Sequence, residues 1–211
     1  MDMLKNIKNS NLMFNNYFEI PEIVYNISDL LEIFNLNNEE WAIYGKNPYK
    51  SLHTKYVKEL KCISDQFNLD VIENIKFFKT LPYGSVSPHT DKRNVAVNIP
   101  IIVNDDMYVT FYVKRESEVK ESPSLHYNKE SFKTKAKKYK PTTISETLYL
   151  KKTTCIRTDV PHSVTNNSEQ DRILLSISVK DKYDDFTTMK DLYLSGDLLN
   201  VYLWFRLYYR A

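Results

Sequence analysis

Residues 172–180, RILLSISVK, predict the fold of this chain more directly than any other stretch. Their side chains alternate in character, as in a β-strand, where successive residues point to opposite faces. One face is apolar and is expected to pack: Ile173, Leu175, Ile177 and Val179. The other face carries a guanidinium and hydroxyl groups: Arg172, Leu174, Ser176 and Ser178. The segment therefore predicts a strand that separates an apolar core from a polar interior.

Other short segments rich in β-branched and aromatic residues share this character. They are NIKFFKTL (74–81), NVAVNIPIIV (94–103), YVTFYVKR (108–115), TLYLKK (147–152) and TTCIRTDV (153–160). Turn residues separate them, and no helical periodicity lies between them. This order favours an antiparallel sandwich or barrel over a βαβ fold.

The 211 residues fit one domain with elaborations. Residues 1–75 are predicted to be mainly helical, with helices over 27–34 and about 52–67 from apolar spacings near 3.6. Residues 76–182 form the predicted barrel core, and 183–211 a helical C-terminal part. The fold class is therefore mainly β with flanking helices.

The composition is that of a soluble globular protein, 42% hydrophobic and 27% charged. The net charge of +2 gives the whole chain no strong attraction for nucleic acid or membranes, and neither partner is expected. Cys62 and Cys155 show no metal-ligand spacing, which makes a reducing cytoplasm the expected location. The first residues lack the apolar run of a signal peptide.

Two segments outside the strands have more than one interpretation. The polar insertion 115–143, with KTKAKKYK at 133–140, is interpreted first as a solvated, mobile loop and second as a lid beside the barrel mouth. A nucleic-acid groove is the weakest interpretation, because the rest of the chain does not share its basic charge. The apolar stretch Leu198–Tyr209 is too short to span a bilayer. It is expected to pack on the barrel or, alternatively, to form a homodimer interface.

Three residues form a candidate metal site. His89 and Asp91 are two apart, so on a strand both would face the same side, and His162 follows Pro161 in TDVPHSVTN. Two imidazoles and one carboxylate are the ligand set of a non-haem Fe(II) centre with open positions. Arg172, ten residues after His162 (172 − 162), could hold a dicarboxylate cosubstrate through a bidentate grip. The other two histidines, His53 and His126, are expected on an exposed helix and in a loop.

At this point the chain resembles the Fe(II)/2-oxoglutarate-dependent oxygenases over about residues 78–180. LPYGSVSPHTD (81–91) is similar to the strand that carries their first two ligands. HSVTNNSEQDRILLSISV (162–179) is similar to their distal histidine, turn and arginine strand, most closely in the aspartyl/asparaginyl β-hydroxylase-like branch and next in the prolyl-hydroxylase-like branch. The resemblance implies a double-stranded β-helix, a cupin-like jelly roll.

By that resemblance His89, Asp91 and His162 bind iron, and Arg172 holds the C5 carboxylate of 2-oxoglutarate. The chain departs from the family at Leu174, where several branches carry serine beside the arginine, so Ser176 is the candidate substitute. The Arg-x-His pair of the aspartyl-hydroxylase branch is also absent, and Asn98 stands there as a candidate cosubstrate contact. Tyr83 is another candidate, because a tyrosine upstream of the ligand strand has this role in some relatives.

The predicted activity is a dioxygenase reaction that uses Fe(II), 2-oxoglutarate and O2 to hydroxylate or otherwise oxidise a C–H bond. Succinate and CO2 are the co-products, and the substrate is an amino-acid residue or a small molecule. The first alternative is a non-oxidative metal-binding cupin, meaning an isomerase, a lyase or a ligand-binding module. The second is a non-catalytic protein with a decayed site. Binding of 2-oxoglutarate separates the oxygenase from the first alternative.

Overall fold

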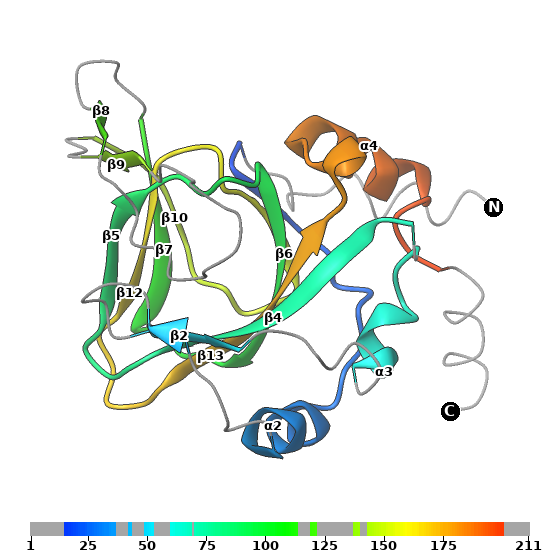
Figure 1. The fold of residues 1–211 in the computed structure, drawn as a ribbon, viewed down its shortest axis with the longest axis horizontal. Coiled ribbons are helices and arrows are strands. Elements are labelled where there is room, and N and C mark those ends of the chain that lie inside the picture. Colours follow the sequence, from blue (N-terminus) through cyan, green and yellow to red (C-terminus); the bar gives the residue numbers. More distant parts are fainter. Residues whose placement is uncertain are drawn as a thin grey trace.

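The computed structural model describes residues 15–36, 42–43, 49–52, 60–68, 70–113, 119–121, 137–139 and 143–200. Its strands form two sheets that face each other (Figure 1). The larger sheet has the order β1 (Tyr17–Glu19), β11 (Thr154–Arg157), β6 (Val95–Ile102), β13 (Arg172–Val179), β4 (Ile72–Thr80), β3 (Tyr49–Leu52) and β2 (Ala42–Ile43). The smaller sheet has the order β10 (Ile144–Leu148), β7 (Met107–Tyr112), β12 (His162–Asn166), β5 (Ser85–His89), β9 (Lys137–Tyr139) and β8 (Val119–Glu121).

The strand order defines a jelly roll of the cupin-like, double-stranded β-helix type. From β4 to β7 the chain alternates between the two sheets, and from β10 to β13 it alternates again. The result is two four-stranded layers, β11-β6-β13-β4 and β10-β7-β12-β5, in which neighbouring strands are antiparallel. The predicted fold class is confirmed.

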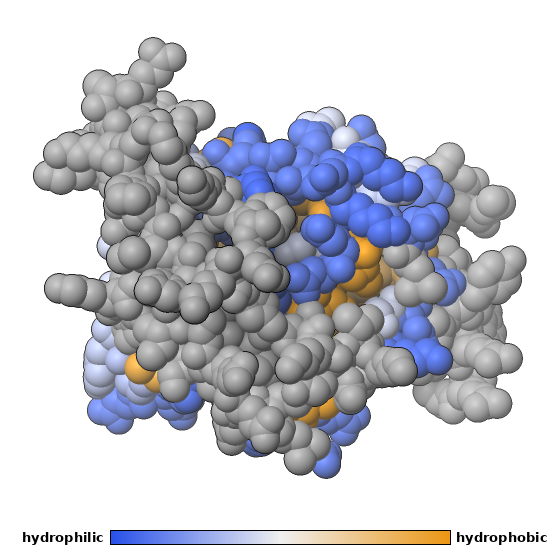
Figure 2. Space-filling view, in the orientation of Figure 1, coloured by the Kyte–Doolittle hydropathy of each residue, from blue (hydrophilic) through white to orange (hydrophobic). Residues whose placement is uncertain are grey.

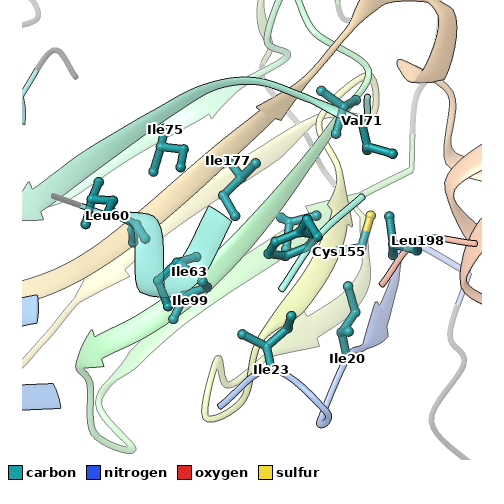
Figure 3. Close-up of a cluster of buried hydrophobic side chains, with 14 of the residues drawn as sticks. Ile20, Ile23, Leu60, Ile63, Val71, Ile75, Ile99, Cys155, Ile177 and Leu198 are labelled. Carbon is teal, nitrogen blue, oxygen red and sulfur yellow. The ribbon is translucent and has the colours of Figure 1, made fainter. Parts of the chain in front are cut away.

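Both faces of the larger sheet are buried, which extends the prediction made from RILLSISVK. The face with Ile173, Leu175 and Ile177 packs beneath the helices in the main apolar cluster. That cluster also takes side chains from α2 (Ile27–Leu36), α3 (Lys61–Ser64) and α4 (Phe186–Ser195). Figure 3 shows Leu60 and Ile63 beside Ile75, Ile99 and Ile177, with Cys155 and Leu198 at the other end of the cluster.

The opposite face of the larger sheet lines the space between the sheets. There Leu174 packs with Ala96 and Ile156 of its own sheet and with Val109 and Phe111 of the smaller one. Arg172 and Ser176 lie on the same face of β13 as Leu174 and are 3% and 1% exposed. The barrel interior therefore has an apolar middle with polar groups on either side of it along β13.

The C-terminal helix α4 has the caps that end helices. The Asp185 carboxylate accepts a hydrogen bond from the Thr188 backbone N–H at 2.8 Å, and Gly196 closes the helix with φ +88°. Met189 and Tyr193 face the core. In Figure 2 the outer side of this region is mostly hydrophilic, and hydrophobic side chains are visible mainly in the recess below it. No described helix is long and apolar enough to cross a membrane.

The N-terminal part differs from the predicted mainly helical segment. A helix forms at Ile27–Leu36 as expected, but Tyr17–Glu19 and Tyr49–Leu52 are strands that pair with β11 and β4. In the region of the predicted second helix, only Lys61–Ser64 is described as α-helix, and residues 53–59 lie outside the described residues. Strand pairing at a sheet edge overrides local helical spacing because edge strands gain backbone partners from the neighbouring strand.

The Lys-rich insertion is partly described. Its residues 119–121 and 137–139 are strands β8 and β9, which pair with each other, and β9 pairs with β5 at His89↔Lys138. These residues are therefore part of the smaller sheet rather than an unpaired loop. The rest of the insertion, including His126, lies outside the described residues, as do His53 and residues 201–209 of the apolar C-terminal stretch. At the start of that stretch Leu198 is buried and Leu199 bridges Phe67, while the homodimer stays a prediction.

The first testable prediction concerns β13. Leu175→Ala should lower the free energy of unfolding by about 2–5 kcal/mol, because Leu175 is fully buried between the sheet and the helices. The same substitution at Leu194, which is 40% exposed on α4, is the matched control and should cost less than about 1 kcal/mol. Urea unfolding followed by circular dichroism measures both variants. Equal losses in the two would contradict the packing described for β13.

Candidate metal centre

The three predicted ligands meet at one end of the barrel. The ligand atoms of His89, Asp91 and His162 all lie within 4.8 Å of one another. This is close to the span of one ion's coordination shell, since metal–ligand bonds to imidazole and carboxylate are about 2.0–2.2 Å long. His162 is 4% exposed, whereas the side chains of His89 and Asp91 are 21% and 28% exposed. The centre is therefore closed behind His162 and open on the side of the other two residues.

The strands that carry the two histidines are paired at the site. His162 begins β12 and is the direct partner of His89, the last residue of β5. A register shift follows, so that the next pair is Val164↔Val86. This bulge lets β5 turn both Val86 and His89 towards the barrel, a local re-aiming that bulges often provide beside functional sites. The imidazole centroids lie 4.5 Å apart.

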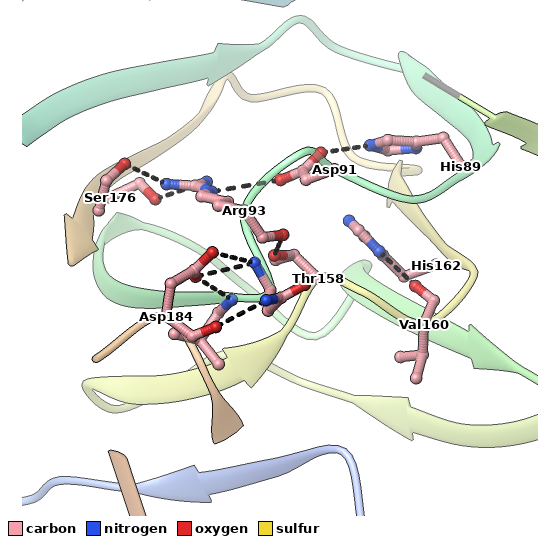
Figure 4. Close-up of polar contacts among 11 residues, drawn as sticks. His89, Asp91, Arg93, Thr158, Val160, His162, Ser176 and Asp184 are labelled. Carbon is pink, nitrogen blue, oxygen red and sulfur yellow. Dashed lines mark hydrogen bonds and ion pairs between the residues drawn. The ribbon is translucent and has the colours of Figure 1, made fainter. Parts of the chain in front are cut away.

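Asp91 reaches the site from a loop, which corrects the expectation that it shares a strand face with His89. β5 ends at His89, and Asp91 lies two residues beyond it. The loop is held by backbone contacts: Asp91 N–H donates to the Thr158 carbonyl at 2.9 Å, and the Thr158 hydroxyl donates to the Arg93 carbonyl at 2.6 Å. Figure 4 shows these contacts around the site.

The far end of the loop is fixed by Asp184. Its carboxylate accepts hydrogen bonds from the backbone N–H groups of Asn94 and Val95 at 2.8–3.0 Å. The Asn94 side-chain amide donates to the Asp184 carbonyl at 2.6 Å (Figure 4). A loop held at both ends keeps the Asp91 carboxylate in place without help from a ligand.

Backbone carbonyls orient both imidazoles. His89 Nδ1 lies 2.8 Å from the Ser87 carbonyl oxygen, and His162 Nδ1 lies 3.0 Å from the Val160 carbonyl oxygen. A carbonyl only accepts, so each Nδ1 must carry the hydrogen, and the lone pair of a neutral ring is then on Nε2. This is the arrangement by which proteins present Nε2 to a metal ion.

The charge of the centre calls for a cation between these groups. His89 Nε2 lies 3.4 Å from Asp91 Oδ1, and both atoms carry lone pairs when the ring is neutral. Burial alone would lower the pKa of His89, but the hydrogen bond and the charge of Asp91 outweigh it and raise that pKa. Burial likewise opposes the ionised form of Asp91, yet His89, Arg93 and His162 hold its pKa well below the usual range. Burial, and then the neighbouring His89, lower the pKa of His162 to about 4.

Arg93 is a site residue that the sequence reasoning missed. Its Nε donates to Asp91 Oδ2 at 3.3 Å, and its two terminal nitrogens donate to Ser178 Oγ at 2.9 Å and Ser176 Oγ at 3.1 Å. In Figure 4 the guanidinium lies between Asp91 and Ser176. Its place two residues after Asp91 in HTDKR was the available signal, but its partners on β13 depend on the fold.

Arg172 lies in the same barrel, farther along β13. Its guanidinium is buried, its Nε has no hydrogen-bond partner, and no described carboxylate forms an ion pair with it. Burial lowers its pKa to about 10. The turn before it is fixed by the buried Asn166 amide, which donates to the carbonyl oxygens of Thr80, Leu81 and Gln170. A buried cation without a described anionic partner is costly, so this residue could hold an anionic ligand.

The three other candidate contacts have different surroundings. Asn98 is buried on β6, and its Oδ1 has no partner. Ser176 accepts its hydrogen bond from Arg93, not from Arg172. Tyr83 is 68% exposed in the turn between β4 and β5, has φ 54°, and donates to Glu169. The structure does not bring Tyr83 to the triad, because that turn lies at the opposite end of β5 from His89.

No family model and no curated protein matches the chain. Among solved structures, it is similar to the epimerase SnoN in complex with Fe3+, alpha ketoglutarate and nogalamycin RO, with 10% identity over 79% of both chains and a TM-score of 0.47. It is also similar to E. coli ycfD, with 9% identity over 85% of this chain and 53% of that chain and a TM-score of 0.43.

A third similar structure is the oxalate decarboxylase from Bacillus subtilis, with 9% identity over 68% of this chain and 28% of that chain and a TM-score of 0.34. The assignment of the cupin-like jelly roll rests on the strand order itself.

The second prediction tests the metal centre. The protein should bind one equivalent of Mn(II), and Asp91→Ala should weaken binding by more than about tenfold, since removing even an outer-shell partner of a metal site costs about 10–100-fold. Asp106→Ala, at an exposed carboxylate of the β6–β7 turn, is the control and should bind as the wild type does. Isothermal titration calorimetry measures all three. Full affinity in the Asp91 variant would remove the carboxylate from the centre.

The third prediction concerns pH. A metal ion at His89 Nε2 must displace the proton that Asp91 stabilises there, whereas His162 and Asp91 have already lost theirs near neutral pH. Mn(II) affinity should therefore fall as pH drops below the raised pKa of His89, by about tenfold per pH unit because one proton is released. Titrations in buffers of different ionisation enthalpy count that proton. Release of two protons above pH 5 would contradict the ionisation states described here.

Proposed function

We propose that the protein is an Fe(II)- and 2-oxoglutarate-dependent oxygenase. The observation that carries this proposal is a pair of features in one barrel. The first is a triad with both Nε2 atoms directed at a carboxylate, and the second is a buried guanidinium that pairs with no described acidic side chain. The triad is the ligand set of non-haem Fe(II) oxygenases, which leaves coordination positions open. The guanidinium suits bidentate binding of a carboxylate, as in 2-oxoglutarate, or of a phosphate.

The residues present fit both groups. His89, Asp91 and His162 would hold the iron through nitrogen and oxygen ligands. Arg172 would hold the C5 carboxylate of 2-oxoglutarate. Asn98, buried on β6, is a candidate second contact through its Nδ2 group, which is the hydrogen-bond donor of the amide. Bound iron and cosubstrate would supply the oxidation itself, with 2-oxoglutarate and O2 consumed and succinate and CO2 released.

The chain's own residues position the ligand groups and exclude water from the barrel. Arg93 holds the Asp91 oxygen that faces away from His89, so that one carboxylate oxygen stays directed at the metal position. Leu174, Val109 and Phe111 form an apolar layer in the barrel. Such a layer strengthens the electrostatic attraction between Arg172 and a carboxylate, because it lowers the local dielectric.

The reaction proposed is oxidation of a C–H bond of an amino-acid residue or a small molecule, with hydroxylation as the first candidate. The sequence similarity of 162–179 to the aspartyl/asparaginyl β-hydroxylase-like branch supports this choice. The chemistry belongs to the iron and its cosubstrate, and the protein selects which bond is presented to them.

The fourth prediction tests the proposed function. Anaerobic protein with Mn(II) should bind 2-oxoglutarate, and Arg172→Met should weaken that binding by about 2–5 kcal/mol, or roughly 30- to 4,000-fold, as expected when one partner of a buried charge pair is removed. Arg157→Met is the matched control, because Arg157 is half-buried on β11 and already paired with Asp159. Its affinity for 2-oxoglutarate should not change.

Turnover completes this test. With Fe(II) and air the wild type should convert 2-oxoglutarate to succinate, and His162→Ala should abolish the conversion. Metal binding without any binding of 2-oxoglutarate would overturn the proposal and favour a non-oxidative cupin. Unchanged affinity in Arg172→Met would remove Arg172 from the cosubstrate site.

A further inference from the structure

A row of polar side chains crosses the larger sheet inside the barrel at the metal end. Ser176 of β13 is the register partner of Lys76 on β4 and of Asn98 on β6. Register partners in a sheet point to the same side, with Cβ atoms about 4.5–5.5 Å apart. Lys76 therefore projects to the same side as Ser176, whose hydroxyl accepts a hydrogen bond from Arg93.

Arg93 and Lys76 bring two positive charges to this end of the barrel. A guanidinium has five N–H donors. The hydrogen bonds of Arg93 to Asp91, Ser178 and Ser176 use one on each nitrogen, so that one donor on each terminal nitrogen has no partner among the described residues. Lys76 is partly buried and forms no ion pair with a described acidic side chain. Burial, and then the charge of Arg93, lower the pKa of Lys76. The two cations are therefore close enough to repel each other.

Asp91 cannot neutralise both cations. Its carboxylate already faces His89 on one oxygen and Arg93 on the other, and in a loaded centre it also serves the metal ion. Glu73 lies three residues from Lys76 on β4 and is exposed. Among the described residues, no acidic side chain at the metal end is therefore paired with Lys76, and this shortage is separate from the one at Arg172.

The two cationic sites are distinct. Arg172 and Ser176 are four residues apart on one strand, about 13 Å at a rise of about 3.3 Å per residue. Leu174 lies between them on the same face and packs in the apolar layer. A dicarboxylate held by Arg172 would therefore not neutralise Lys76 with the same carboxylate.

We propose that Lys76 and Arg93 form a second anion site, which binds a carboxylate or phosphate group of the substrate to be oxidised. The inference rests on the proposed function for the identity of the reaction and on the charge arrangement for the site. Because Arg93 contacts the ligand Asp91 directly, the anionic group is held beside the metal position. The bond that is oxidised then lies close in the substrate to its acidic group, which makes small acids a better match than neutral molecules.

The fifth prediction uses simple anions as probes. Protein saturated with Zn(II), which does not turn over, and with 2-oxoglutarate should bind sulfate or acetate, measured by calorimetry at constant ionic strength with chloride as the reference. Lys76→Met should lower that affinity at least about tenfold, while Lys76→Arg retains it because the charge is kept. Lys79→Met is the matched control, since Lys79 lies on the same strand but pairs with Asp171. Preference for sulfate indicates a phosphate group, and preference for acetate indicates a carboxylate.

Two results would overturn the inference. The first is equal sulfate and acetate affinity in the wild type and Lys76→Met. The second is a loss of 2-oxoglutarate affinity in Lys76→Met as large as that in Arg172→Met, which would make Lys76 part of the cosubstrate site. Sulfate titration of Arg172→Met protein without 2-oxoglutarate tests the Lys76–Arg93 site separately. It keeps the inference testable even if the wild type fails to bind 2-oxoglutarate, which would be a failure of the proposed function alone.

Discussion

The site depends on two hydrogen bonds on the sides of the rings that face away from it. They run from the imidazole Nδ1 atoms to the carbonyl oxygens of Ser87 and Val160. They fix the rings so that both Nε2 atoms face the carboxylate of Asp91, and the ligand atoms of the three residues lie within 4.8 Å of one another. Three groups that carry lone pairs are stable together only around a cation, whether a proton or a metal ion. The bulge in β5 and the braced loop 90–94 maintain this convergence in the absence of any ligand.

The larger sheet makes the cationic interior possible because its two faces have different tasks. The face under α2, α3 and α4 is mainly apolar and supplies the packing, so the inner face can carry Arg172, Ser176 and Lys76. A buried charge destabilises the fold by several kcal/mol unless it is paired. The packing of the apolar face offsets this loss for the cations that have no described partner. Successive residues of one strand point to opposite faces, so neighbouring positions on β13 contribute alternately to packing and to ligand binding.

The strands could be predicted because alternation is a local pattern, and in 172–180 it showed which side chains share a face. The three residues that converge at the candidate centre could be predicted from their types and from the spacing of His89 and Asp91, although His162 joins them only through the fold. The rest depends on pairing. The position of Asp91 in a loop, the contacts of Arg93 with β13 and the register of Lys76 with Ser176 arise only when distant segments meet. The N-terminal strands were missed for the same reason, since β1 and β3 are defined by their partners.

One pairing links the insertion to the candidate metal centre. β9 adds to the edge of the smaller sheet opposite His89. An insertion on a solvent-facing turn can change length freely, but this one pairs with the strand that presents a candidate metal ligand. A change in the insertion could therefore alter what approaches the candidate metal position, as long as β9 stays in register with β5.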